Sequence, residues 1–428
     1  MLSETLRRET ILAVDDLAQD LISISHRIHA EPELALEEVK SAALLAGELE
    51  QRDLPVQREA FGLATALVSE FGRSDGPRIA ILSEYDALPG IGHACGHNII
   101  AAAGLGAALA LSRLELPGRV RWLGTPAEER YGGKELMARA GAFEKVDAAM
   151  MIHPANHDLV SNPTLAIAEV DAIYHGRAAH ASSSPYLGLN ALDAVVGAYQ
   201  AIAQLRQHIR GDERIHGIIT EGGLAPNVVP ERAACQFYVR AANAARLGEL
   251  KRRVQACFEA GALSSGCRLE LVWGEADYLD LKTSWPAARI FEQHARSLGR
   301  VFTPAEDLPP GKTGSTDMGN VSHRVPAIHP MLAVAPHDVS IHNPQFARWA
   351  ASERGDMAVI DGAKALALTA LELMADEAAL AAARRDFQAT AEASRTSLGL
   401  VGAGDPGGGG GAHQQNGQHV HAGGCGCA

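Results

Sequence analysis

The stretch from Ile79 to Asn98 carries the residues whose types and spacing point most clearly to chemistry. Its sequence, IAILSEYDALPGIGHACGHN, begins with an apolar run, continues with two carboxylates and ends with His93, Cys95 and His97 at alternate positions. A thiol and two imidazoles this close together, framed by glycines, are typical of metal ligands. The spacing is too short for the paired C-x-x-C of a structural zinc site. We therefore expect a catalytic centre whose other ligands come from elsewhere in the chain.

Four further residues, at three places in the chain, could complete such a centre. Glu128 and Glu129 follow an apolar strand and a proline. Adjacent side chains of an extended segment point in opposite directions, so one could hold metal while the other faces substrate. His153 ends an apolar run, and His342 lies in the turn SIHNP. None of these positions is specific alone, because an acidic turn or a lone histidine is often structural.

The whole chain limits the possible classes of function. It has 428 residues, 47% hydrophobic and 21% charged, as expected for a globular enzyme of two or three domains. The net charge of −13 offers no basic surface for nucleic acid. We find no apolar run of the roughly 18 residues needed to span a bilayer, and no secretory signal at the start. The six cysteines are scattered, so we expect reduced thiols in a cytoplasmic protein.

The order of the predicted elements gives the fold that must position these residues. Strands and helices alternate from about residue 56 to His153, which predicts a parallel or mixed sheet with covering helices. Between 165 and 273 the order is β-α-β-β-α-β, close to a ferredoxin-like unit. We read this second part as an insertion into the first.

Several local predictions accompany this reading. We expect one helix over Glu9–Ala30, a helix capped by Asn98 and a single strand over Ala327–Val334. The domains are predicted as follows: catalytic, 1–163 and 281–378; inserted, 164–280; terminal helix or linker, 379–400; and a disordered Gly/His-rich tail without a core, 401–428.

Seven sequence blocks carry a resemblance to a known family. In order they are GIGHACGHN, GTPAEE, MIHP, the HA…P…NALDA run from His180, GGLAPNVVPE, GSTDMGNVSHRVPAIHP and IHNPQF. From about Leu12 to Met374 the chain resembles the metal-dependent aminoacylase/carboxypeptidase superfamily. The nearest branch is the amidohydrolases, with aminobenzoyl-glutamate hydrolases, auxin-conjugate hydrolases and aminoacylase-1-like dipeptidases. This resemblance implies an α/β fold: a mixed-sheet, metallopeptidase-like catalytic domain with an inserted ferredoxin-like α+β dimerisation domain.

The resemblance also implies roles for individual residues. The ligands of one or two divalent ions (zinc, manganese or cobalt) would be Cys95, His97, Glu129, His153 and His342. Glu128 would be the general base that deprotonates the attacking water, and Asp86 would orient a ligand. His180 would polarise the scissile group, often in the partner subunit of a homodimer. The substrate would be held by Asn227, by Ser315 and, through its carboxylate, by Arg240.

Arg130 and Tyr131 depart from the pattern, because relatives usually carry glycines after the paired glutamates. Either both side chains point to solvent, or they narrow an electropositive pocket for a compact, aromatic, anionic substrate. The leading hypothesis is therefore a hydrolase cleaving an amide-type C–N bond of a small carboxylate-bearing molecule: an N-acyl amino acid, an aminobenzoyl-glutamate-like conjugate or a dipeptide. The alternatives are hydrolytic deamination of an aminobenzoate-like compound at the same centre, and a non-catalytic metal- or ligand-binding protein.

Overall fold

A computed structural model describes residues 2–304, 307 and 314–402, so the predicted tail from 403 onward lies outside the described residues. The chain divides into two compact units. Unit 1 contains Met1–Thr164 and Leu281–Leu398, and unit 2 contains Leu165–Asp280. Among the described residues, no helix is long and apolar enough to cross a membrane.

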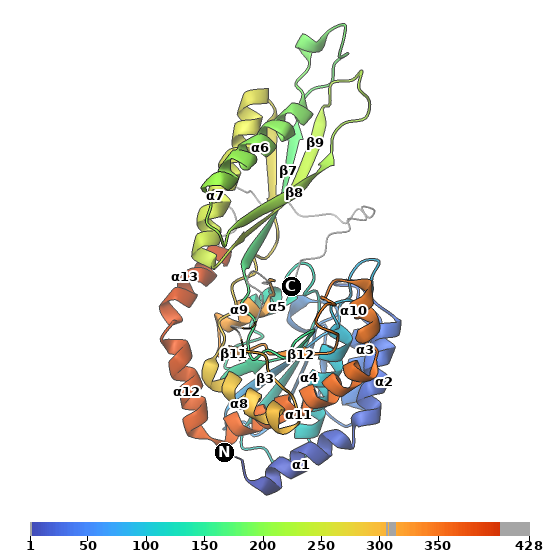
Figure 1. Cartoon of the computed structure of the whole chain (residues 1–428), viewed down its shortest axis with the longest axis vertical. Coiled ribbons are helices and arrows are strands. Elements are labelled where there is room, and N and C mark those ends of the chain that lie inside the picture. Colours follow the sequence, from blue (N-terminus) through green and yellow to red (C-terminus); the bar gives the residue numbers. More distant parts are fainter. Residues whose placement is uncertain (1, 305–306, 308–313, 403–428) are drawn as a thin grey trace. The chain divides into compact units, whose positions relative to one another are not determined.

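Unit 1 is built on a six-stranded mixed sheet with the order β1-β2-β4-β3-β5-β11 (Figure 1). The strands are β1 (Gln57–Arg58), β2 (Leu67–Gly72), β3 (Arg78–Glu84), β4 (Arg119–Thr125), β5 (Ala148–Met150) and β11 (Ala327–Ile328). β3 runs parallel to β4 and β5, β11 is parallel to β5, and β2 is antiparallel to β4. The central strand β3 is buried from Ile79 to Glu84, as expected for a parallel strand covered on both faces.

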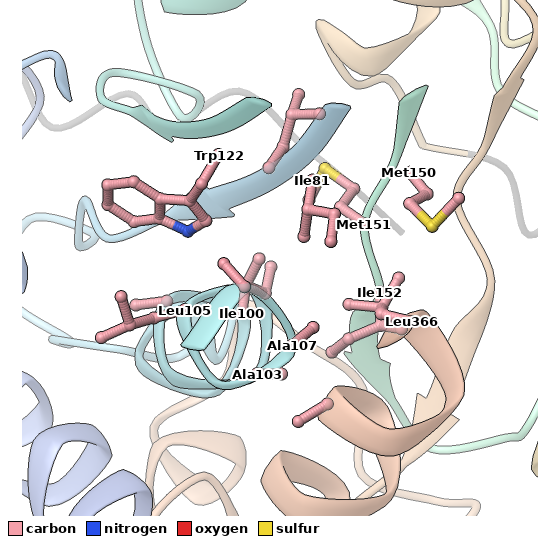
Figure 2. Close-up of a cluster of buried hydrophobic side chains, with 14 of the residues drawn as sticks. Ile81, Ile100, Ala103, Leu105, Ala107, Trp122, Met150, Met151, Ile152 and Leu366 are labelled. Carbon is pink, nitrogen blue, oxygen red and sulfur yellow. The ribbon is translucent and has the colours of Figure 1, made fainter. Parts of the chain in front are cut away.

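Unit 1 also contains helices. They are α1 (Glu4–Asp15), α2 (Ala18–Ala30), α3 (Val39–Glu50), α4 (His97–Leu111), α5 (Gly133–Arg139), α8 (Trp285–Ser297), α9 (Met318–Ser322), α10 (Pro344–Trp349), α11 (Glu353–Ala375) and α12 (Glu377–Gln388). A last helix, α13 (Ala391–Gly402), follows α12. Every residue of α4 is buried, which explains its run of alanine and leucine. Figure 2 shows Ile100 of α4 below Ile81 of β3, with Trp122 of β4 and Leu366 of α11 beside it. α4 is thereby packed against β3.

Two helix predictions were wrong in detail. The predicted helix over Glu9–Ala30 is two helices, α1 and α2, with a break at Asp16 and Leu17. Asn98 does not cap α4, because the helix begins after Gly96. The buried Asn98 amide instead donates to Ser25 Oγ (2.8 Å) and to the backbone carbonyl of Ala350 (3.0 Å). Asn98 thus joins distant parts of the chain.

The predicted strand over Ala327–Val334 is split between two sheets. β11 joins the main sheet, whereas β12 (Met331–Ala333) pairs in parallel with β6 (His153–Ala155). His329 and Pro330 lie between them, and proline has no N–H to continue a ladder. This small second sheet fixes the backbone of His153.

Unit 2 is an antiparallel sheet with the order β10-β7-β9-β8, and the helices α6 and α7 pack on it. Its elements are β7 (Ala166–His175), α6 (Ala191–Leu205), β8 (Arg214–Glu221), β9 (Arg232–Ala241), α7 (Ala244–Ser265) and β10 (Arg268–Trp273). Buried and half-buried residues alternate along β7 and β9, as in a sheet with one face on a core. The predicted fold class is confirmed: an α/β unit with a mixed sheet, interrupted by a ferredoxin-like α+β unit.

Candidate metal centre

The turn between β3 and α4 places two of the predicted ligands. Gly96 precedes α4 with a φ of +80°, a conformation that residues with a side chain rarely adopt. A Cβ at this position would lie 2.8 Å from Pro154 Cγ, so the close packing also requires glycine. Cys95 and His97 flank Gly96, and both side chains are buried.

The segment after β4 supplies the paired glutamates. The backbone turns at Ala127, a buried residue with a φ of +62°. Its N–H donates to Glu38 Oε1 over 2.8 Å, and this contact helps to hold a strained conformation. Glu128 and Glu129 follow this turn, and both are buried.

Two histidines join these residues, His153 from the first chain segment of unit 1 and His342 from the second. His153 opens β6, and its Nδ1 donates to Pro154 O at 2.7 Å, which leaves Nε2 at 3.4 Å from Cys95 Sγ. His342 precedes α10 with a φ of +59°, and its Nε2 lies 3.4 Å from Glu129 Oε1. Residues far apart in the sequence thus meet at one place.

Three overlapping groups of possible ligand atoms result, with all atoms in a group within 4.8 Å of one another. The groups are Cys95–His97–His153, Cys95–Glu129–His342 and His97–Glu128–Glu129. Within the described residues, His97 Nε2, His342 Nε2 and both Glu129 carboxylate oxygens are buried without a hydrogen bond. Such atoms cost stability unless something else binds them. A thiol, imidazoles and carboxylates fit a divalent transition metal at this place.

Asp86 ties two of these residues together. Its Oδ1 lies 3.1 Å from His97 Nδ1, and its Oδ2 accepts the Glu129 N–H at 2.9 Å. Burial alone would raise the pKa of Asp86, but the hydrogen bond and charge of His97, together with the Glu129 N–H and the charge of Lys134, outweigh burial and lower it. A carboxylate on Nδ1 leaves Nε2 facing the ligand cluster, which is the usual support for a metal-binding histidine.

The cluster is strongly acidic. Burial raises the pKa of Glu128 well above its ordinary value, and the charges of Glu84, Glu129 and Asp317 raise it further. A divalent cation would supply positive charge where these carboxylates repel one another.

The profile of Peptidase family M20/M25/M40 matches residues 80–419, which is most of the chain. The chain belongs to this family. Superfamily membership, predicted from the seven sequence blocks, is therefore confirmed.

Curated relatives of this M20/M25/M40 member include Xaa-Arg dipeptidases. The mouse protein (Mus musculus) is 37% identical over 400 residues, covering 90% of this chain and 93% of its own length. The human protein (Homo sapiens) is also 37% identical over 405 residues, covering 90% and 92%. One of the subunits of the p-aminobenzoyl-glutamate hydrolase of Escherichia coli is 35% identical over 296 residues, covering 63% and 61%.

Solved structures share the fold at lower identity. A putative aminohydrolase from Staphylococcus aureus has a TM-score of 0.69 at 20% identity and covers 86% of this chain and 100% of its own. A dinuclear metal-binding peptidase of the M20 family from Bacillus subtilis has a TM-score of 0.61 at 22% identity, covering 84% and 99%. With the family match and the ligand cluster, the chain is a metal-dependent hydrolase of carbon–nitrogen bonds.

Three of the predicted site residues of this M20/M25/M40 member lie in unit 2. His180 is exposed, and its Nδ1 accepts the N–H groups of Ser182 (3.3 Å) and Ser183 (3.2 Å). Its Nε2 therefore carries the ring hydrogen. Asn227 precedes Val228, which forms an isolated antiparallel β-bridge with His180. Arg240 lies on β9.

The remaining predicted residues are in unit 1. Arg130 and Tyr131 are exposed, and the guanidinium lies 4.9 Å from the centre of the Tyr131 ring. Ser315 is buried and lines a small cavity. The cavity is also lined by His153, Asn162, Thr164, Gly314, Thr316, His329, Met331 and Ile341.

The sequence analysis assigned no role to several residues that the structure brings to the cluster. They are Glu38, Glu84, Lys134, Asp317 and His329. His329 packs edge-on against His153, with ring centres 5.4 Å apart, and burial lowers its pKa to about 3. Glu84 ends the central strand, and Asp317 lies in the block GSTDMGNVSHRVPAIHP. The positions of these two residues could therefore have suggested that they belong to the site. We find no sequence signal for the burial of Lys134.

Proposed function

We propose that this chain hydrolyses the amide-type C–N bond of a small carboxylate-bearing substrate. The candidates are a dipeptide, an N-acyl amino acid and an aminobenzoyl-glutamate-like conjugate. The convergence of one thiol, three imidazoles and two adjacent carboxylates in unit 1 carries this proposal. The substrate class draws support from the dipeptidase and aminobenzoyl-glutamate hydrolase relatives.

In this proposal one or two ions of zinc, manganese or cobalt are held by Cys95, His97, Glu129, His153 and His342. The thiolate favours zinc, whereas imidazole and carboxylate also suit manganese and cobalt. When bound, such a metal brings the pKa of water towards about 7 and polarises the substrate carbonyl.

Glu128 is the proposed general base. Its carboxylate takes a proton from the attacking water, the C–O bond forms, and the C–N bond then breaks as Glu128 gives that proton to the leaving nitrogen. Glu128 is buried beside Glu129, so bulk solvent competes little for the proton. Asp86 holds both His97 and the Glu129 backbone in position throughout.

Residues of unit 2 complete the proposed mechanism. The Nε2–H of His180 is a donor suited to the oxygen that becomes negative as water attacks. Arg240 has the planar fork that matches a substrate carboxylate, and Asn227 adds a polar contact. We propose that the chain forms a homodimer in which His180 serves the partner's site, because two-fold dimers are the commonest oligomers.

Near unit 1's ligand cluster, Ser315 contributes a hydroxyl to the cavity beside His153, where it can contact substrate. Arg130 and Tyr131 are proposed to meet the anionic part of the substrate. We also propose a cytoplasmic location, where the scattered cysteines stay reduced.

A substrate panel with metal analysis tests the proposal. The purified protein is loaded with zinc, manganese or cobalt and incubated with dipeptides, N-acyl amino acids, aminobenzoyl-glutamate and aminobenzoates. We expect release of a free amino acid in at least one amide series, and no release by Glu128→Gln. Ammonia released from an aminobenzoate would instead indicate deamination. Bound metal with no turnover across the panel would favour a non-catalytic binding protein.

A further inference from the structure

Lys134 is a fully buried lysine in the first turn of α5. Its ammonium donates to Glu84 Oε1 in a short contact and to Asp317 Oδ1 at 2.6 Å. Its backbone N–H also donates to Asp317 Oδ2 at 2.8 Å. All three side chains are at most 1% exposed. Lysine is almost never buried this completely without ion partners, so its position here calls for a physical reason.

The reason lies in a fourth group of possible ligand atoms. Oxygens of Glu84, Glu128 and Asp317 lie within 4.8 Å of one another, and this carboxylate group shares Glu128 with the His97–Glu128–Glu129 group. Among the described residues, Glu84 Oε2 is buried and makes no hydrogen bond. Three buried carboxylates at this spacing would attract a divalent cation.

The Lys134 ammonium already supplies a positive charge to this carboxylate group. Burial opposes the charged form, but the charges of Asp317 and Glu84 outweigh burial and raise the pKa of Lys134, so the ammonium stays protonated. An ammonium donates hydrogen bonds and brings one positive charge. Unlike a metal ion, the ammonium does not coordinate carboxylate oxygens. The Glu128 carboxylate therefore stays able to accept a proton.

We propose that Lys134 is a positioning residue that acts as a built-in cation: it occupies the Glu84–Glu128–Asp317 group and keeps metal ions out of it. Glu128 then remains a base and does not become a ligand. The consequence for Glu128 rests on the proposed function, whereas the exclusion of metal does not. The two can therefore be tested separately.

Metal counting on Lys134→Ala tests the exclusion. Wild type and variant are loaded with manganese, passed through a desalting column and analysed for metal per folded chain. We expect one more ion per chain in Lys134→Ala than in wild type. The melting temperature of the variant should also rise more with added manganese than that of wild type, because the extra ion replaces the lost charge. An unchanged count in folded variant would overturn the proposal.

Lys364→Ala is a matched control, because Lys364 pairs with Asp15 elsewhere in unit 1 and is also mostly buried. Its metal count should equal that of wild type. Should Lys134→Ala not fold, the count is made on Lys134→Gln, whose neutral amide keeps a hydrogen bond to a carboxylate. The same gain of one ion is expected there, and an unchanged count refutes the proposal equally.

The role of Glu128 is tested by the double variant Lys134→Ala/Glu128→Gln. If the extra ion takes Glu128 as a ligand, the double variant should lose that ion and return to the wild-type count. Retention of the extra ion would contradict the part of the proposal that concerns Glu128. Turnover by Glu128→Gln alone would instead contradict the proposed function, so the two failures are distinguishable.

Discussion

Glu38 provides the prediction whose size follows most directly from the structure. Its carboxylate is buried and accepts hydrogen bonds from the Ala127 N–H (2.8 Å) and the Thr65 hydroxyl (2.7 Å). Burial, with a smaller contribution from the charge of Asp86, raises its pKa from 4.5 to about 7. Glu38→Gln keeps an oxygen for Ala127 and removes the titration. The variant should therefore be more stable than wild type, but only at high pH.

The sign and size of this stability difference follow from the linkage between protonation of Glu38 and folding. Below pH 4.5 the carboxyl is neutral in both the folded and the unfolded chain, so it adds no pH-dependent penalty. Between pH 4.5 and 7 the unfolded chain loses this proton while the folded chain keeps it, and stability falls as pH rises. Above pH 7 the full penalty of about 3 kcal/mol remains, at 1.36 kcal/mol per pKa unit. Glu38→Gln should thus gain up to about 3 kcal/mol over wild type at pH 8 and little at pH 4.5.

Urea unfolding at pH 5, 6, 7 and 8 measures this difference. Metal-depleted protein is used, because a bound cation near Asp86 would also change the proton affinity of Glu38. The exposed neighbour Glu37 gives a matched control, and Glu37→Gln should track wild type at every pH. A difference in unfolding free energy between Glu38→Gln and wild type that stays constant with pH would refute the electrostatic reasoning.

Three further predictions concern the catalytic centre. Glu128→Gln should lower turnover by at least about 100-fold with unchanged metal content by elemental analysis; comparable metal loss would mean that Glu128 and Glu129 have exchanged roles. Cys95→Ala should lower metal affinity by at least about tenfold in a chelator competition, and unchanged affinity and activity would make the thiol structural. Mixing inactive Glu128→Gln and His180→Ala should restore about a quarter of wild-type activity after subunit exchange, if His180 acts in the partner's site. Exchange without recovery would exclude that arrangement.

The sequence predicted the fold well where elements are long and periodic. The mixed sheet of unit 1 and the β-α-β-β-α-β order of unit 2 were both expected and confirmed. The errors lie at short local features. Asn98 is a good helix cap by type, but its side chain makes a buried contact with Ser25, and Gly96 takes the N-cap position before α4. Likewise, Pro330 marks a break in the segment from Ala327 to Val334, but the sequence does not show that the two halves join different sheets.

The candidate site was predicted only in part, and the reason is physical. Cys95, His97 and the paired glutamates could be predicted as site residues because their types are suited to metal binding. They also follow strand ends, where open α/β sheets place their sites. Lys134 gives no such signal, because lysine is normally exposed and its partners are 50 and 183 residues away in sequence. Only the fold shows that this ammonium sits among carboxylates.

Backbone strain at the centre could not be read from the sequence either. Ala127 and His342 both have positive φ, at +62° and +59°, which costs roughly 1–3 kcal/mol each for residues with a side chain. Each is tethered by its N–H: Ala127 to Glu38, and His342 to Ala94 O at 2.9 Å. The fold therefore sets the ligand positions at the cost of local strain. Glu38→Gln retains the tether and removes only the charge, whereas Glu38→Ala would remove both. The difference between these two variants separates the electrostatic effect of Glu38 from its hold on the turn before Glu128.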